Sequence, residues 1–226
     1  MREIVLDTET TGLSFRSGDR IIEVGCVELS NHVPTGKTLQ FYCSVDKKIN
    51  DEAVKIHGLT NDFLAPHPNF ESQADVFLDF IRNDTLIIHN AEFDLGFINN
   101  ELRILEKKQL KNKIIDTVSL ARKTLNTRIA NLDYLCRRFE IDLGKRSLHG
   151  ALLDSHLLAE VYLELIGGKQ ISLNLTSATK NSVFYEEGSK DLPPVVLKIN
   201  PSKEDILRHK KMTKQINRPL WEKINY

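Results

Sequence analysis

The sequence predicts an α/β fold in which a mixed sheet of five strands is flanked by helices. Three β-rich segments come first and are separated by turn residues, which favours a meander of consecutive strands. Helical and strand patterns then alternate, as expected when later strands join the sheet through helical connections. A Gly-Gly pair at 167–168 ends this alternation, and a Ser-, Thr- and Asn-rich segment follows it.

The expected strands are segments rich in Val, Ile and other residues that favour β structure. They cover 3–9, 20–29, 38–45, 85–88 and 114–115, with a turn expected over 31–36. The expected helices follow apolar residues at helical spacing, and Asn131 is expected to cap one of them. They cover 51–57, 61–64, 70–81, 91–107, 118–123, 132–139 and 150–165.

The composition is that of an ordinary folded protein, with 41% apolar and 27% charged residues. The formal net charge is zero, but residues 1–166 carry 25 acidic and 20 basic side chains, whereas the remainder carries 6 and 11. An acidic front lacks the basic footprint that captures nucleic acid, unless bound divalent cations reverse the local sign. Three widely spaced cysteines argue against a zinc site or a disulfide framework. Without a long apolar run or a signal-like start, a cytoplasmic protein with no membrane attachment is expected.

The chain after the predicted domain divides into two parts. Residues 1–166 are predicted to form the domain, and 167–192 a flexible linker. The tail over 193–226 contains an apolar segment at 195–199 and a basic stretch at 202–215 that is expected to be helical. This tail is too short for a core of its own, and its apolar residues are spaced for docking on a partner. A disordered tail with nonspecific affinity for nucleic acid is the alternative.

Four carboxylates stand where acidic side chains are unexpected. Asp7 and Glu9 lie two residues apart at the end of the first strand, so they point to one face, about 6–7 Å apart along it. Solvated charges at a strand end explain this pair alone equally well. Asp94 and Asp154 fall on helical stripes of apolar residues, where an acid is costly unless it is paired or bound to a metal. A structural Asp or a shifted helical phase explains one such residue, but the four together indicate a shared site.

Converging carboxylates suit hard cations, with Mg²⁺ or Mn²⁺ favoured over Zn²⁺. Two such ions commonly serve phosphoryl transfer, in which they activate a water and stabilise the leaving oxygen. His149 lies five residues before Asp154, at the start of the last predicted helix. An imidazole, with an ordinary pKa of about 6.5, can take a proton from water near neutrality. A surface histidine near a helix start is the alternative.

Together these residues resemble the DEDDh exonucleases of the ribonuclease-H-like superfamily. The three motifs of that family are intact and in the family order, as DTETTGL at 7–13, HNAEFD at 89–94 and HGALLD at 149–154. The resemblance covers the whole predicted domain and implies a ribonuclease-H-like fold. It implies that Asp7, Glu9, Asp94 and Asp154 hold two divalent metal ions, Mg²⁺ or Mn²⁺, and that His149 is the catalytic general base.

Within that family the chain looks most like the epsilon proofreading subunits of bacterial DNA polymerase III. The segment DEAVKIHGL resembles the stretch in which a Glu and a His of those subunits contact the terminal nucleotide. The resemblance implies this role for Glu52 and His57, with Asp7, Glu9 and Asp154 also contacting the substrate. Without it, Glu52 and His57 are an ordinary carboxylate and a loop histidine. The implied reaction releases nucleoside 5′-monophosphates from frayed 3′ ends of DNA, with no reading of base identity.

The resemblance also implies partners. The tail over 193–226 is expected to dock on the catalytic alpha subunit of DNA polymerase III, and a small theta-like subunit is among the expected partners. The segment QISLNL at 170–175, with Gln170 as its anchor, resembles a peptide that binds the bacterial sliding clamp. A linker with incidental leucines matches this segment nearly as well.

Two other functions stay open. A DEDDh exoribonuclease or an oligoribonuclease-like enzyme that trims RNA shares the metal site, so the site residues do not exclude it. The match around Glu52 and the docking tail favour DNA. The other alternative is a non-catalytic module that bridges polymerase and clamp, and the complete set of four carboxylates and His149 argues against it.

Overall fold

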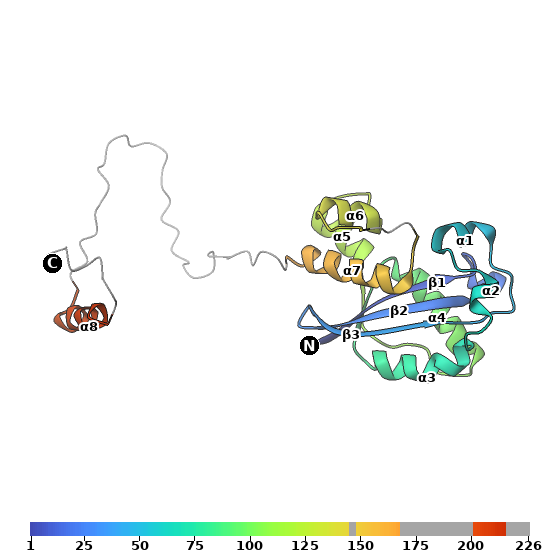
Figure 1. Ribbon diagram of the computed structural model, residues 1–226, viewed down its shortest axis with the longest axis horizontal. Coiled ribbons are helices and arrows are strands. Elements are labelled where there is room, and N and C mark those ends of the chain that lie inside the picture. The colour runs from blue at the N-terminus through green and yellow to red at the C-terminus, as the bar shows by residue number, and fades with distance from the viewer. Residues whose placement is uncertain (145–147, 168–200, 216–226) are drawn as a thin grey trace. The chain divides into compact units, whose positions relative to one another are not determined.

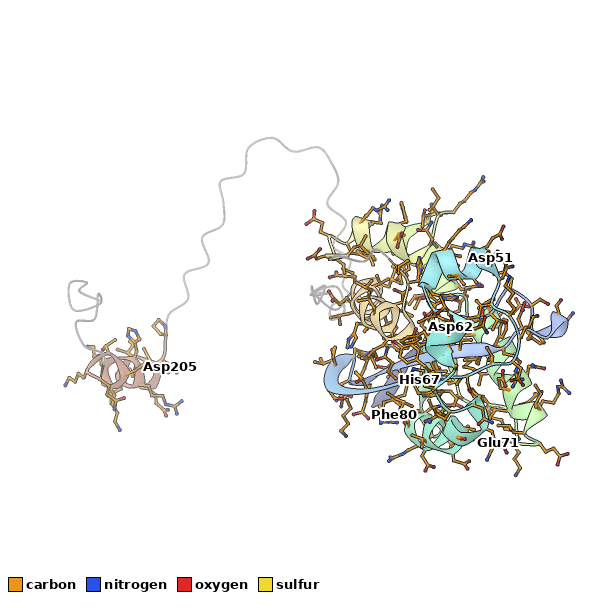
Figure 2. All side chains as sticks on the ribbon, turned by 45° about the vertical axis from the view of Figure 1, so that its right-hand side comes forward. Asp51, Asp62, His67, Glu71, Phe80 and Asp205 are labelled. Carbon is orange, nitrogen blue, oxygen red and sulfur yellow. The ribbon has the colours of Figure 1, made fainter. Side chains whose placement is uncertain are left out.

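The computed structural model describes residues 1–144, 148–167 and 201–215 (Figure 1). The chain divides into two units, Met1–Leu173 and Asn174–Tyr226. The described part of the second unit, residues 201–215, contains the helix α8 (Lys203–Thr213), which agrees with the helix predicted at 202–215. Its exposed side chains include Asp205 (Figure 2). The predicted clamp-binding peptide and the apolar segment at 195–199 lie outside the described residues. Among the described helices, none has the length and apolar character needed to cross a bilayer.

Five strands form one mixed sheet in the order β3-β2-β1-β4-β5 (Figure 1). They are β1 (Arg2–Thr10), β2 (Ile21–Ser30), β3 (Val33–Tyr42), β4 (Thr85–Ile88) and β5 (Ile114–Asp116). β1 pairs antiparallel with β2, and β2 pairs antiparallel with β3, so the predicted meander is confirmed. β4 and β5 extend the sheet beyond β1 as parallel strands. The prediction of a mixed five-stranded sheet flanked by helices is therefore confirmed.

The third strand begins earlier than predicted because the turn before it is tighter. Asn31 and His32 take positive φ angles of 50° and 68°, and Ser30 pairs directly with Val33. A two-residue turn of this kind matches the right-handed twist of the strands that it joins. β3 lies at the edge of the sheet, where Pro34 is tolerated because one side of the strand needs no ladder partner. The predicted turn over 31–36 and the predicted strand start at residue 38 were therefore wrong.

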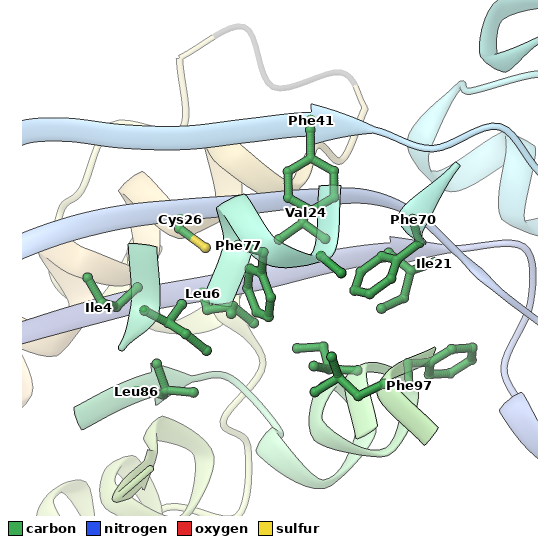
Figure 3. Close-up of a cluster of buried hydrophobic side chains, with 14 of the residues drawn as sticks. Ile4, Leu6, Ile21, Val24, Cys26, Phe41, Phe70, Phe77, Leu86 and Phe97 are labelled. Carbon is green, nitrogen blue, oxygen red and sulfur yellow. The ribbon is translucent and has the colours of Figure 1, made fainter. Parts of the chain in front are cut away.

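Helices cover both faces of the sheet (Figure 1). They are α1 (Asp51–His57), α2 (Asn61–Leu64), α3 (Phe70–Ile81), α4 (Ala91–Ile104), α5 (Thr117–Leu125), α6 (Leu132–Arg138) and α7 (Ala151–Leu165). On one face, Phe77 of α3 and Phe97 of α4 pack with Leu6 of β1 in the largest apolar cluster (Figure 3). On the other face, Leu158 of α7 packs with Val5 of β1, and α5 and α6 form a further apolar cluster with α7. Both faces of the sheet are thus buried, so a site that is open to solvent is expected at the ends of the strands.

Local signals fix where several helices begin and end. The side chain of Asn131 accepts a hydrogen bond from Tyr134 N at 2.8 Å, so the predicted cap of α6 is confirmed. α4 ends earlier than predicted because Glu106 adopts a positive φ of 55° and Lys107 N donates back into the last turn at 2.8 Å. Beyond α7, Gly167 takes a φ of 81°, which is the helix stop that the sequence predicted.

Candidate active site

β1 carries two carboxylates on one side of the sheet. Asp7 and Glu9 are partly exposed and alternate with the buried Thr8 and Thr10, so they share a face as predicted. Asp7 pairs with Gly25 of β2, and the register of this pairing shifts just after Glu9. The regular ladder of β1 therefore ends beside the two carboxylates.

Asp94 enters the same region from the first turn of α4. Its side chain is buried at 3% exposure, and Thr8 Oγ1 donates a hydrogen bond to Asp94 Oδ1 at 2.7 Å. Asn90 takes a left-handed conformation with a φ of 65°, which turns the chain from β4 into the helix. Burial raises the pKa of Asp94 to about 7, against the lowering effect of the hydrogen bond from Thr8. The acid predicted on an apolar stripe is therefore a buried group joined to β1.

α7 brings Asp154 to this region by docking its first turn on the backbone of β2. A Cβ atom at Gly25 would lie 2.2 Å from backbone atoms of Ala151 and Leu152, so this contact requires glycine. Ser155 Oγ also donates a hydrogen bond to Gly25 O at 3.0 Å. Asp154 is 4% exposed. Its position therefore depends on a close approach of two backbones.

Glu23 of β2 supplies the cap that the start of α7 lacks. Gly150 is the N-cap residue of α7 and has no side chain to accept a hydrogen bond from the first turn. The Glu23 side chain is buried, and its Oε2 accepts from Ala151 N at 3.2 Å, a position where the helix dipole favours a carboxylate. Glu23 and Gly25 were not predicted, although a glutamate and a glycine within the apolar stretch IIEVGCV are a visible signal.

The carboxylates and His149 converge. Ligand atoms of Glu9, His149 and Asp154 lie within 4.8 Å of one another, and His149 Nδ1 lies 3.0 Å from Asp154 Oδ2. Burial raises the pKa of Asp7 well above its ordinary value, and the nearby carboxylates of Asp94, Glu9 and Asp154 raise it further. The fold thus brings ligand atoms of Glu9, His149 and Asp154 close together, and the charges of Asp94, Glu9 and Asp154 act on Asp7 nearby.

The electrostatics of this cluster fit a divalent cation. Burial raises the pKa values of Asp7 and Asp94, and the neighbouring carboxylates raise the pKa of Asp7 further, so ionising both groups without a counter-charge is costly. A bound cation reverses the local sign and favours the ionised carboxylates. The donors are carboxylate oxygens from Asp7, Glu9, Asp94 and Asp154, which is the ligand type preferred by Mg²⁺ and Mn²⁺.

A cavity of about 240 Å³ is lined in part by Thr8 and Glu9, so one of the four carboxylates reaches it. α1 contributes Glu52, Ile56 and His57 to its wall, so both residues implied to contact the terminal nucleotide line it. Leu13, from the turn after β1, and Phe93 of α4 also line it and make its wall largely apolar. Leu13 and Ile56 are well exposed, at 83% and 49%, so apolar surface faces solvent here.

His57 has a defined protonation state in this wall. Its Nδ1 accepts a hydrogen bond from Leu59 N at 3.0 Å, which places the proton of the neutral ring on Nε2. Burial lowers the pKa of His57, with a smaller opposing effect from a hydrogen bond to the Thr10 backbone and a further lowering by His149. The ring is therefore neutral near pH 7.

Comparisons with known proteins agree with this geometry. The family model described as Exonuclease matches residues 4–162. The chain is 42% identical over 222 residues to the DNA polymerase III subunit epsilon of Rickettsia conorii, with 96% of each chain covered. The chain belongs to the exonuclease family. This exonuclease is also 44% identical over 203 residues to the DNA polymerase III subunit epsilon of Escherichia coli strain K12, covering 86% of this chain and 82% of the relative.

Solved structures share the fold of this exonuclease. Exonuclease X in complex with 5′ overhanging duplex DNA matches with a TM-score of 0.58 and 22% identity, over 73% of this chain and 91% of that one. The nuclease domain of 3′hExo, a DEDDh family member bound to rAMP, matches with a TM-score of 0.64 and 18% identity, over 74% and 92%. The prediction of a metal-dependent 3′→5′ exonuclease with a ribonuclease-H-like fold is confirmed.

Proposed function

We propose that this exonuclease removes nucleotides from the 3′ end of DNA as the proofreading subunit of a bacterial DNA polymerase III, in the cytoplasm. In this proposal Asp7, Glu9, Asp94 and Asp154 hold two Mg²⁺ or Mn²⁺ ions, and His149 is the general base. The observation that carries the proposal is that ligand atoms of Glu9, His149 and Asp154 lie within 4.8 Å of one another, with Glu9 also lining a cavity. The charges of Asp94, Glu9 and Asp154 act on the nearby Asp7. Likeness to an epsilon subunit over nearly the whole chain supports the choice of DNA and of the polymerase.

The chemistry is divided between the ions and the side chains. When bound, the ions supply Lewis-acid stabilisation of the charge that develops on the phosphodiester oxygens. The contact between His149 Nδ1 and Asp154 Oδ2 at 3.0 Å orients the imidazole, which in the proposal accepts a proton from the attacking water. The His149 side chain is 46% exposed, so water reaches it directly.

The cavity suits a terminal nucleotide with any base. Leu13, Ile56 and Phe93 offer apolar surface, and packing or stacking on such surface is open to every base. Glu52 and His57 add polar groups to the same wall, and in the proposal they hold the terminal nucleotide together with the carboxylates. Selectivity for errors then arises because an unpaired 3′ end leaves the duplex more easily than a paired one.

Hydrolysis rates on mismatched and paired 3′ ends, and on DNA and RNA of the same sequence, test the choice of substrate. With Mg²⁺, the full chain is expected to release nucleoside 5′-monophosphates from a duplex with a mismatched 3′ terminus at least about tenfold faster than from a fully paired duplex, because unpairing costs a few kcal/mol. An RNA strand of the same sequence controls for the sugar. A higher rate on RNA than on DNA overturns the proofreading assignment in favour of an RNA-trimming enzyme.

The proposal extends to the rest of the chain. Residues 1–166 form the exonuclease domain, 167–192 form a linker whose segment 170–175 binds the sliding clamp, and 193–226 bind the polymerase alpha subunit, with a theta-like subunit as a further partner. Support comes from α8, on which Leu207 is 71% exposed and Met212 is 50% exposed beside two lysines. Exposed apolar side chains on a basic helix are typical of a helix that docks in a partner's groove.

Leu207→Glu tests the docking role of α8 in the full chain. We expect binding to the purified alpha subunit to weaken by at least about tenfold, since a charge then enters an apolar contact, while hydrolysis of single-stranded DNA keeps the parent rate. Titration calorimetry measures the binding. Val76→Glu on α3 is the matched control, because Val76 is also exposed, at 52%, and lies in the other unit. Undiminished binding of Leu207→Glu excludes α8 as the docking element.

A further inference from the structure

The segment that carries His149 is attached to the last turn of α1. The His149 side chain is 46% exposed, so burial of the ring does not fix its position. Its backbone is fixed instead, because His149 N donates a hydrogen bond to Ile56 O at 2.9 Å. This bond joins two segments that are far apart in the sequence.

Leu148, the residue before His149, fills a niche that a glycine leaves open. Gly58 ends α1 as a left-handed C-cap with a φ of 73°, and its N–H donates to Val54 O. A Cβ atom at Gly58 would lie 2.6 Å from Leu148 Cδ1, which is closer than such atoms approach in proteins. The Leu148 methyl group therefore occupies the space that any other residue at position 58 would claim.

The same turn of α1 forms part of the cavity wall. Ile56 and His57 line the cavity, and the carbonyl oxygen of Ile56 accepts the hydrogen bond from His149 N. One helical turn thus contacts both the proposed nucleotide cavity and the segment that carries the proposed base.

We infer that Gly58 and Leu148 are positioning residues, which hold His149 in its working place through the last turn of α1. The inference rests on the proposed role of His149 as general base. The hydrogen bond to Ile56 and the methyl group in the niche fix the backbone, and the contact with Asp154 then directs the ring. A catalytic group displaced by about 1 Å can lose about 10²-fold in rate.

A double-mutant cycle in the full chain tests this inference. Leu148→Ala removes the methyl group, and Gly58→Ala fills its niche, so both changes break one contact. Each is expected to lower kcat on single-stranded DNA by about 10-fold to 100-fold, with KM changed by less than about threefold. The double variant is expected to be no slower than the slower single variant, because changes that break the same contact are not additive. Losses that multiply, or single variants with the parent kcat, overturn the inference.

Two matched control variants show whether the loss of kcat in Gly58→Ala and Leu148→Ala comes from backbone strain or from lost apolar surface. Gly36→Ala places alanine at a φ of 84° with nothing within 4 Å of its Cβ atom, so it carries the strain of Gly58→Ala without a displaced neighbour. Ile166→Ala removes a side chain that is 38% exposed, at the opposite end of α7 from His149. Both are expected to keep the parent kcat, and a tenfold loss in either contradicts the inference.

Amide hydrogen exchange gives a readout that does not depend on activity. In the metal-free chain, the His149 amide is expected to exchange at least about tenfold faster in Leu148→Ala and Gly58→Ala than in the parent and Gly36→Ala, because its bond to Ile56 O opens more often. If the parent releases no nucleotide, the proposed function fails while the exchange rates still decide whether the attachment exists. Equal exchange rates in the parent and the variants overturn the inference.

Discussion

Asp94→Asn is expected to lower the rate of nucleotide release severely and, at the same time, to make the metal-free chain more stable than the parent. The amide keeps an oxygen that can accept the hydrogen bond from Thr8 Oγ1, so the local structure is retained. It does not replace a carboxylate as a metal ligand, and losing several kcal/mol of charge stabilisation lowers kcat on the order of 10³-fold. The stability rises because a charge that burial disfavours has been removed.

The gain in stability is expected to depend on pH. The pKa of Asp94 rises from an ordinary 3.8 to about 7 in the folded chain, and the pKa of Asp7 is also raised. Between pH 3.8 and about pH 7 the folded chain holds a proton on Asp94 that the unfolded chain has released. The free energy of unfolding of the metal-free parent therefore falls as pH rises. Asp94→Asn removes part of this fall. The rise in melting temperature of this variant over the parent is therefore expected to be small near pH 3.8 and to reach its full size above about pH 7.

Thermal unfolding with and without Mg²⁺ measures both effects. A cation that binds the folded parent raises its melting temperature, and this rise is expected to be much smaller in Asp94→Asn. Asp62→Asn is the matched control, because Asp62 is an exposed carboxylate on α2 (Figure 2), and it is expected to change neither activity nor melting temperature. A metal-free Asp94→Asn chain that melts at a lower temperature than the parent contradicts the expectation that the buried charge of Asp94 destabilises the fold. Nucleotide release at the parent rate removes Asp94 from the site.

His149→Ala is expected to lower kcat by about 10²-fold to 10⁴-fold while metal binding persists. The variant loses the group that accepts the proton from water, but the carboxylates of Asp7, Glu9, Asp94 and Asp154 stay in place. The rise in melting temperature with Mg²⁺ is therefore expected to match that of the parent. Single-turnover release of nucleotide from single-stranded DNA measures the chemical step directly.

His156→Ala is the matched control for this substitution. His156 is exposed on α7 and lies two residues beyond Asp154, so its loss perturbs the same helix without removing the proposed base. It is expected to keep the parent rate. An equal loss in both variants points to damage in α7, and a parent rate in His149→Ala assigns the proton transfer to another group.

The carboxylates of the site could be predicted because they conflict with their surroundings in the sequence. Asp94 and Asp154 each interrupt an apolar helical stripe, and both prove to be buried, at 3% and 4% exposure. The alternation of strand residues likewise placed Asp7 and Glu9 on one face. A costly residue in a local pattern is visible from the sequence, because the pattern itself defines which face should be apolar.

The supports of the site could not be predicted, because they depend on contacts between segments far apart in the chain. Glu23 and Gly25 stand out in the apolar pattern of β2, but that pattern does not identify the first turn of α7 as the partner of Gly25 or as the helix start that Glu23 caps. The niche at Gly58 likewise has meaning only once Leu148 is placed in it. The start of β3 was missed for a related reason, since Pro34 is acceptable only at the edge of a sheet.

The docking of α7 on Gly25 gives the two halves of the site different durability. The contact is between backbones and involves no side-chain rotamer, so the first turn of α7, which carries Asp154, keeps its place as long as the helix stays on the sheet. His149 lies just before this turn, and its attachments include the hydrogen bond to Ile56 O, the Leu148 methyl group and the contact of its ring with Asp154. A change in α1 that breaks the hydrogen bond to Ile56 O is therefore expected to displace the proposed proton acceptor before it separates the carboxylates.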